Sequence, residues 1–160
     1  MIISNSTPLI AFARIGRLDL LKEIAGNLVI PTAVEREISE YGCGKTGSVD
    51  LAKESWITVR SVQSEDSVRL LLSVLDRGEA EVIVLALEHP ECLVLIDELT
   101  GRQVAESMGL SVTGSVGILI HAKESGKTKN VRPYLDEMMR RGIRYSRRFI
   151  DEVLRKVGEL

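Results

Sequence analysis

The chain of 160 residues carries 21 Lys and Arg against 23 Asp and Glu, a net charge of −2, and 44% of its residues are hydrophobic. This length and composition predict a single domain over residues 1–160, large enough to bury a core. A charge so close to neutral does not by itself indicate a nucleic-acid-binding protein, and no apolar run approaches the roughly 20 residues of a membrane span, so no membrane association is expected.

The N-terminal half predicts short strands that alternate with helices. Residues 1–4 form an apolar run typical of a buried strand, and a helix with Pro8 in its first turn follows and ends at Gly16. Thr32 is expected to cap a later helix. The remaining elements predicted in this half are a helix over 18–24, a strand over 28–30, helices over 33–40 and 48–54, a strand over 56–62 with Ile57 and Val59 inward, and a helix from 64 to about 75.

The C-terminal half continues the alternation after a break predicted at residues 76–78. The expected order is a helix over 79–88, a strand over 93–96, a helix over 100–108, a strand over 110–112, and helices over 116–125, 130–140 and 146–157. Strands that alternate with helices predict an α/β fold in which helices cover both faces of a parallel sheet.

The two cysteines, Cys43 and Cys92, lie far apart without a CxxC spacing, so neither a zinc site nor a disulfide framework is predicted. The N-terminus lacks the basic segment and long apolar run of a signal peptide. A cytoplasmic location is therefore expected.

Polar side chains fall where the predicted strands end. Asn5 and Asp97 each follow a strand, as does Thr113. Parallel strands share one carboxyl edge, where ligands bind, and helices that start there add Glu37 and either Glu79 or Glu81; the latter two lie about 200° apart on a helix and cannot face the same way. Carboxylates gathered in this manner repel each other unless a cation neutralises them, and oxygen donors suit Mg²⁺ or Mn²⁺.

Each of these residues also has a structural interpretation. Asp97 would cap the helix that starts near residue 100. Glu79 would be stabilised in the first turn of its own helix by the helix macrodipole. Glu37 would lie on a solvated helix face, and Thr113 would be a turn or cap residue. The residue pattern alone leaves both interpretations open.

The C-terminal segment is basic. Residues 122–160 hold eleven Lys and Arg against six Asp and Glu. Cations there would neutralise phosphates without reading base sequence, whereas a solvated face that pairs with the acidic residues of the same helices is an equal alternative. The two basic groups are Lys123, Lys127, Lys129 and Arg132, and Arg140, Arg141, Arg144, Arg147 and Arg148.

Four segments, taken in order, resemble the PIN-domain superfamily: ISNSTPLIAFARIGRLDLL, VIPTAVEREI, LDRGEAEVIVLALE and LVLIDELTGRQVAESMGLSVTGSVGIL. The nearer likeness is to prokaryotic members related to the toxins of toxin–antitoxin pairs. The resemblance covers essentially the whole chain. It implies a three-layer α/β/α sandwich with a central parallel sheet, and a Mg²⁺- or Mn²⁺-dependent ribonuclease that uses three or four acidic residues.

Carried over residue by residue, the four acidic positions of the family fall on Asn5, Glu37, Glu79 and Asp97, with Glu81 a rival for the third. Thr113 matches a polar position that borders the site. The resemblance also implies RNA as substrate, an antitoxin protein as partner and a homodimer, to which the apolar faces of the last helices could contribute unless they belong to the core.

Asn5 departs from the family's pattern because an amide oxygen ligates Mg²⁺ without bringing a negative charge. Three interpretations stay open: a weakened enzyme, a non-catalytic module that binds nucleic acid or a partner, and an engineered or deamidation-prone position.

Overall fold

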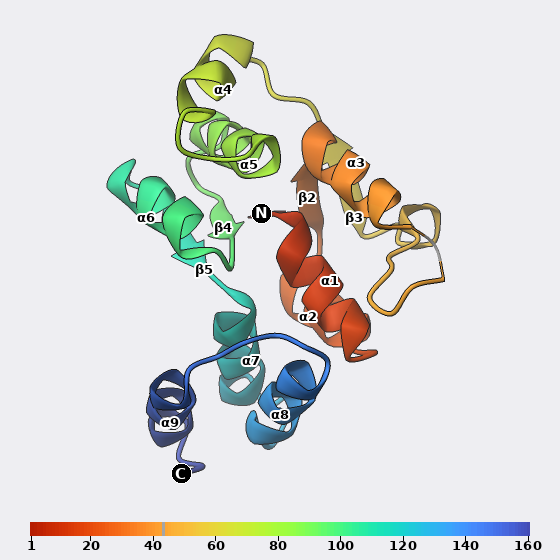
Figure 1. The fold of residues 1–160 in the computed structure, drawn as a ribbon, viewed down its shortest axis with the longest axis vertical. Coiled ribbons are helices and arrows are strands. Elements are labelled where there is room, and N and C mark those ends of the chain that lie inside the picture. Colours follow the sequence, from red (N-terminus) through yellow and green to blue (C-terminus); the bar gives the residue numbers. More distant parts are fainter. Residues whose placement is uncertain (43) are drawn as a thin grey trace.

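The computed structural model describes residues 1–42 and 44–160, so the expectation for Cys43 lies outside the described residues. Within those residues, five parallel strands form one sheet in the order β3-β2-β1-β4-β5 (Figure 1). The strands are β1 (Ile2–Ser4), β2 (Leu28–Pro31), β3 (Ile57–Arg60), β4 (Leu93–Leu95) and β5 (Ser111–Thr113). Because all five run the same way, their carboxyl ends meet at one edge.

Helices connect the strands. They are α1 (Ser6–Arg14), α2 (Leu18–Ala25), α3 (Thr32–Tyr41), α4 (Glu65–Leu71), α5 (Arg77–Glu88), α6 (Leu99–Ser107), α7 (Ser115–Glu124), α8 (Arg132–Arg140) and α9 (Arg147–Lys156), with a 3₁₀ turn, η1 (Leu51–Lys53). The right-handed crossover rule puts α1, α2 and α3 on one face of the sheet and α5 and α6 on the other. The predicted three-layer α/β/α sandwich is therefore confirmed.

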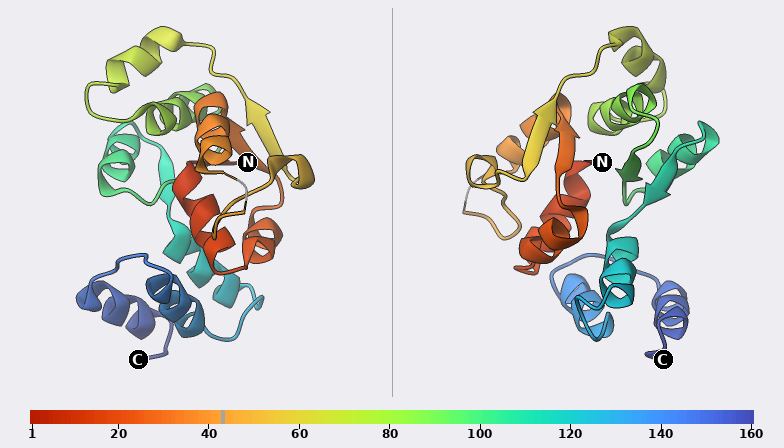
Figure 2. Two further views of the ribbon diagram at one scale, coloured as in Figure 1. Left: turned by 45° about the vertical axis from the view of Figure 1, so that its right-hand side comes forward. Right: turned by 180° about the vertical axis from the view of Figure 1, so that it is seen from behind.

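The core lies between these layers. Ile3, Leu28 and Ile30 of the sheet are fully buried, and α5 packs across β1, β2 and β4 with Ile83 and Leu85 buried. The apolar faces of the last helices also belong to this core, since Val131, Leu135 and Met138 have no exposed surface. Figures 1 and 2 show α7, α8 and α9 together at the end of the molecule opposite α4.

Several predicted boundaries were wrong. The break expected at 76–78 is the start of α5, because the Asp76 carboxylate accepts the backbone N–H of Glu79 and caps the helix. Thr32 is the first residue of α3, and the cap position falls on Pro31. Val59 was expected inward but is 39% exposed, since β3 is an edge strand with one neighbour.

Candidate active site at the carboxyl edge of the sheet

The site lies where the sheet changes its direction of winding. β1 leads to β2 on one side, whereas its other neighbour β4 leads to β5 on the opposite side. In open α/β sheets, this switch point opens a crevice at the carboxyl ends of the two strands. Asn5 leaves β1 there and Glu98 follows β4, and the Asn5 N–H donates to the carbonyl oxygen of Leu95 at 3.0 Å.

Asn5 is 3% exposed and half-paired. Its Nδ2 donates to Oε2 of Glu98 at 3.2 Å, but its Oδ1 is buried and has no hydrogen-bond partner among the described residues. The other oxygen of Glu98 accepts the Thr7 hydroxyl at 2.6 Å. Buried polar atoms are nearly always paired. The unpaired Oδ1 is therefore suited to ligating a cation.

Glu37 and Glu79 come together from α3 and the first turn of α5. The Ser6 hydroxyl donates to Oε2 of Glu37 at 2.6 Å. The other Glu37 oxygen occupies the space that a Cβ would fill at Gly78, one residue before Glu79. Glycine at this position is what allows the two carboxylates to approach the same crevice.

The pKa values of Glu79 and Glu37 are raised by burial and in part by the negative charges of neighbouring carboxylates. Burial raises the pKa of Glu79 to about 7, and the carboxylates of Asp76, Glu98 and Glu37 add to the rise. Burial also raises the pKa of Glu37 against the Ser6 hydrogen bond, again with Asp76 and Glu98 adding to the rise. The charge of Glu98 therefore disfavours the ionised forms of Glu37 and Glu79, and the charge of Glu37 adds to this effect at Glu79.

Glu81 does not belong to this group. Its carboxylate lies 3.5 Å from Nε of Arg77. Burial raises the pKa of Glu81, while Arg77 and the backbone N–H of Ala33 lower it. The structure thus separates the two rivals of the sequence: Glu79 faces the crevice, and Glu81 faces Arg77 and the start of α3.

Asp97 stands beside Glu98 but has a different set of partners. One of its oxygens accepts the Ser115 N–H and the other the Ser115 hydroxyl, both at 2.6 Å. It therefore caps α7, whereas the structural alternative from the sequence had it capping the helix near residue 100. Burial raises the pKa of Asp97; the Ser115 bonds lower it and Glu98 raises it further.

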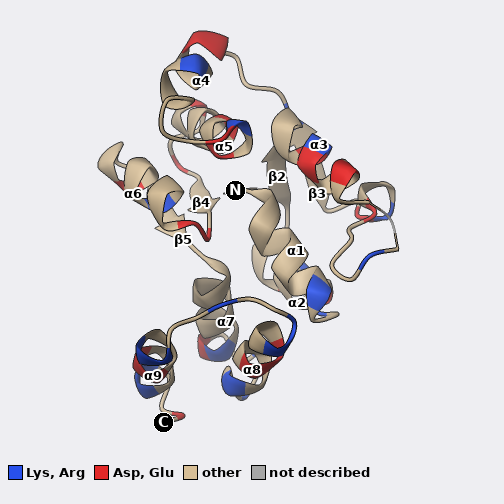
Figure 3. Cartoon of the chain, viewed as in Figure 1, with Lys and Arg blue, Asp and Glu red and all other residues tan. Residues whose placement is uncertain are grey.

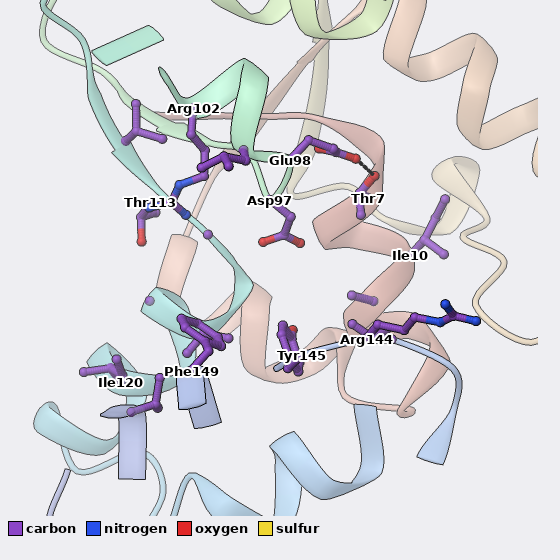
Figure 4. A pocket seen from close by; sticks show the side chains of 18 of the residues that line it. Thr7, Ile10, Asp97, Glu98, Arg102, Thr113, Ile120, Arg144, Tyr145 and Phe149 are labelled. Carbon is purple, nitrogen blue, oxygen red and sulfur yellow. Dashed lines mark hydrogen bonds between the residues drawn. The ribbon is translucent and has the colours of Figure 1, made fainter. Parts of the chain in front are cut away.

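Asp97 and Glu98 line a cavity of about 890 Å³ that also takes in Arg102 and Thr113 (Figure 4). Thr113 is the last residue of β5 and is not in the following turn. Gly117 makes room for its hydroxyl, since a Cβ there would overlap Oγ1. Asp97 and Thr113 are thus brought together, while Asn5 and Glu37 lie outside this lining.

The donor set is oxygen only and negatively charged, which suits a hard divalent cation. Among the described residues, however, no three His, Cys, Asp or Glu side chains are close enough to hold a metal ion between them. Mg²⁺ is commonly bound through one or two carboxylates and several waters. The unpaired Asn5 oxygen and the mutually repelling carboxylates therefore fit such an ion, held in part through water.

Four polar residues of the site were not among the residues predicted to form it: Glu98, Ser6, Thr7 and Ser115. The sequence pattern could have identified Glu98, because two consecutive acidic residues follow strand β4 and either one can face a crevice. No such pattern marks Thr7 and the two serines, because their role is to hold Glu37, Glu98 and Asp97 through contacts with distant parts of the chain.

Basic and acidic residues alternate along the last helices (Figure 3), and three of the eleven Lys and Arg of residues 122–160 pair with an acid one turn away. Arg140 and Arg141 pair with Glu137 at 2.7 and 3.0 Å, and Arg148 pairs with Glu152 at 3.1 Å. The solvated-face interpretation holds for these residues. Arg144 differs, because it lines the cavity without such a partner among the described residues.

A family model described as a PIN domain matches residues 1–159. The chain belongs to the PIN-domain family. No curated protein and no solved structure shows a significant match. The PIN domain is a nucleic-acid-binding fold and often a nuclease, and its members generally use divalent metals. In the described part of this PIN domain, no helix has the length and apolar character needed to cross a bilayer.

Proposed function

We propose that this PIN domain is a metal-dependent ribonuclease that hydrolyses RNA phosphodiester bonds. The observation that carries the proposal is the buried Asn5 oxygen without a partner, at the switch point beside three mutually repelling carboxylates. Buried acceptors are nearly always paired, and Asn5 Oδ1 is one of two unpaired ones among the described residues, with Glu88 Oε2 the other. Perturbed acids in a crevice are typical of functional sites.

Asn5 and one or two of the neighbouring carboxylates of Glu37, Glu79 and Glu98 would hold the Mg²⁺ or Mn²⁺, in part through water, and Asp97 would contribute a further negative charge beside it. Ser6 and Thr7 orient Glu37 and Glu98 through their hydroxyls. Ser115 orients Asp97. When bound, the ion would lower the pKa of a water and offset negative charge on the scissile phosphate.

Two residues of the cavity, Arg102 and Thr113, would contact the substrate. Nη1 of Arg102 and Oδ1 of Asp97 both lie within 3 Å of the point where a Cβ would sit at Gly114, so the guanidinium lies next to the acid. Arg102 is therefore positioned to bind a phosphate oxygen. Thr113 offers a hydroxyl donor from the adjacent strand end.

Cleavage of a labelled single-stranded RNA by purified protein tests the proposal. We expect cleavage with Mn²⁺ or Mg²⁺, none with EDTA, and at least about a hundredfold loss in Glu79→Gln and Glu98→Gln, since each removes a charge next to the reacting phosphate. Glu81→Gln, buried but facing away, is the matched control and should keep most of the activity. If wild type and Asn5→Asp both fail to cleave with either metal, the catalytic proposal is wrong.

A non-catalytic nucleic-acid- or partner-binding module is the second candidate. Two observations favour it: an amide stands at the first acidic position, and both Asp97 oxygens are engaged by Ser115. This candidate predicts RNA binding that weakens with salt but is indifferent to EDTA.

We further propose a homodimer and an antitoxin protein as partners, with a toxin role in the cytoplasm. Because the late helices are core, the surface that supports a dimer is the apolar group around α4: Leu70 is 78% exposed, Val74 60% and Leu72 38%. Exposed apolar groups of this kind mark interaction sites. Sedimentation of wild type against Leu70→Lys, which should favour the monomer, tests this surface.

A further inference from the structure

The cavity beside the acidic crevice has an apolar part that metal-dependent chemistry does not need. Its walls come from α1, α7 and α9 and from the segment between α8 and α9, so parts of the chain far apart in sequence enclose it. Figure 4 shows Asp97 and Glu98 on one side of the cavity and Ile120, Phe149 and Tyr145 on the other. A volume of about 890 Å³ is within the range of small-ligand sites.

Two aromatic rings form part of the apolar wall. The Tyr145 and Phe149 ring centroids lie 5.6 Å apart and the rings are tilted by 37°. Phe149 lies in the first turn of α9, a largely polar helix, and is 39% exposed. Only 4% of the residues in this chain are aromatic, so two of them meeting at one cavity wall is a specific arrangement.

Cations also line the cavity. Arg14, Arg102, Arg144 and Lys156 all contribute to its lining, and within residues 1–42 and 44–160 none of them forms an ion pair. Most of the other late basic residues are paired with carboxylates. Unpaired cations next to an apolar wall and an acidic crevice match a ligand with a flat apolar ring and attached phosphates.

We propose that the cavity is a nucleobase subsite, which takes one unpaired base next to the scissile phosphate and holds it against Tyr145 and Phe149. This inference rests on the proposed ribonuclease function and adds to it a pocket for the base next to the scissile phosphate. A base inside a duplex is stacked between its neighbours and does not reach such a pocket unless it is flipped out. Base–aromatic stacking tolerates any base, so the subsite selects for unpaired structure more than for sequence.

Binding of a fluorescent RNA hexamer to the full chain in EDTA and low salt, read by anisotropy, tests the subsite without catalysis. Six versions of the hexamer each lack the base at one position. We expect one or two positions to lose about 5- to 150-fold in affinity, the range for one stacked base. Phe149→Ala should weaken the intact hexamer by a similar factor and add nothing to the loss at the sensitive position.

The matched control is Met108→Ala, which removes an apolar side chain that is 41% exposed and lies outside the cavity lining. It should bind all hexamers as wild type does, and a duplex of the same sequence should bind at least about tenfold more weakly than the single strand. If wild type cleaves RNA but the base-removal scan is flat and Phe149→Ala has no effect, the subsite is wrong while the ribonuclease proposal stands, and the cavity is left to a protein partner. If RNA is neither bound nor cleaved, both proposals fail.

Discussion

At the scale of single residues, Asn5 would set how strongly the proposed site attracts a cation. Its amide donates to Glu98 and leaves one buried oxygen unpaired. A carboxylate at this position would lose the hydrogen bond and place a like charge against Glu98. Compared with Asp at this position, Asn5 therefore attracts a metal ion less strongly but makes the metal-free protein more stable.

Replacement of Asn5 by Asp should tighten Mn²⁺ binding by at least about tenfold, because one more negative charge faces the ion. In EDTA the variant should be less stable by about 1–3 kcal/mol, since a buried hydrogen bond is replaced by repulsion. Titration calorimetry and urea unfolding with and without Mn²⁺ measure the two effects. Asn27→Asp, in an exposed turn, is the control; equal Mn²⁺ affinity in wild type and Asn5→Asp would contradict the prediction.

Glu79 gives the metal-free protein a pH dependence. Its pKa is raised from 4.5 to about 7 in the folded state, so the folded protein binds more protons than the unfolded one between these values. Stability from this group is therefore highest below about pH 4.5, falls as pH rises to about 7 and stays low above it.

In EDTA, Glu79→Gln should remove this slope and raise the free energy of unfolding at pH 8 by about 1–2 kcal/mol, a figure discounted for solvent screening. Urea unfolding at pH 5 and pH 8 measures it. A slope in Glu79→Gln as steep as that of wild type would assign the titration to another group.

At the scale of elements, the N-terminal turn of α5 is shaped by its neighbour α3. Gly78 is the second residue of α5, and in the interior of a helix Ala is favoured over Gly by about 0.5–1 kcal/mol. A Cβ at this position would overlap the Glu37 carboxylate. The helix therefore forgoes local stability so that Glu37 can reach the crevice.

A double-mutant cycle tests this coupling. Gly78→Ala alone should displace Glu37 and reduce metal-dependent cleavage by about tenfold or more, a consequence of misplacing a ligand. In a Glu37→Ala background the same substitution should leave cleavage unchanged and raise the melting temperature through helix propensity. Additive losses of cleavage in the two variants would show that Gly78 acts on something other than Glu37.

At the scale of the whole molecule, Glu159 ties the chain end to α7 and α8. It accepts the Val131 N–H at 2.8 Å, the Arg132 N–H at 3.0 Å and the Lys123 ammonium at 2.9 Å. Burial raises the pKa of Glu159, but these bonds lower it below its usual value on balance. The stabilisation is therefore present above the unfolded pKa and is lost as pH falls through the folded value.

Glu159→Gln should lower the free energy of unfolding at pH 7 by about 1–3 kcal/mol, as expected for bonds to a charged group. Hydrogen exchange over 131–157 should quicken, because this tie holds the helices next to the cavity. Asp66→Asn, which removes an exposed pair with Arg69 at 3.6 Å, should change stability by less than about 0.5 kcal/mol. Equal effects in the two variants would show that the tie contributes no more than a surface pair.

The sequence predicted the layers of the fold well because short apolar runs such as 28–30 and 93–96, set between helical segments, are typical of the buried strands of a parallel sheet. Boundaries failed where a capping side chain extended a helix, as Asp76 does for α5. For the site, strand ends identified Asn5 and Asp97, but only packing shows that Glu98 joins Asn5 while Asp97 holds α7. Such partnerships depend on contacts between residues far apart in the chain, which a local pattern does not encode.

The glycines next to the crevice have a consequence for attempts to make this protein more heat-resistant. Gly78 and Gly117 lie in helices and have ordinary backbone angles, so a designer guided by helix propensity would change them to Ala first. In both cases a Cβ would overlap a polar side chain, that of Glu37 at Gly78 and that of Thr113 at Gly117. Filling these two positions to gain heat resistance would therefore displace two residues of the proposed site.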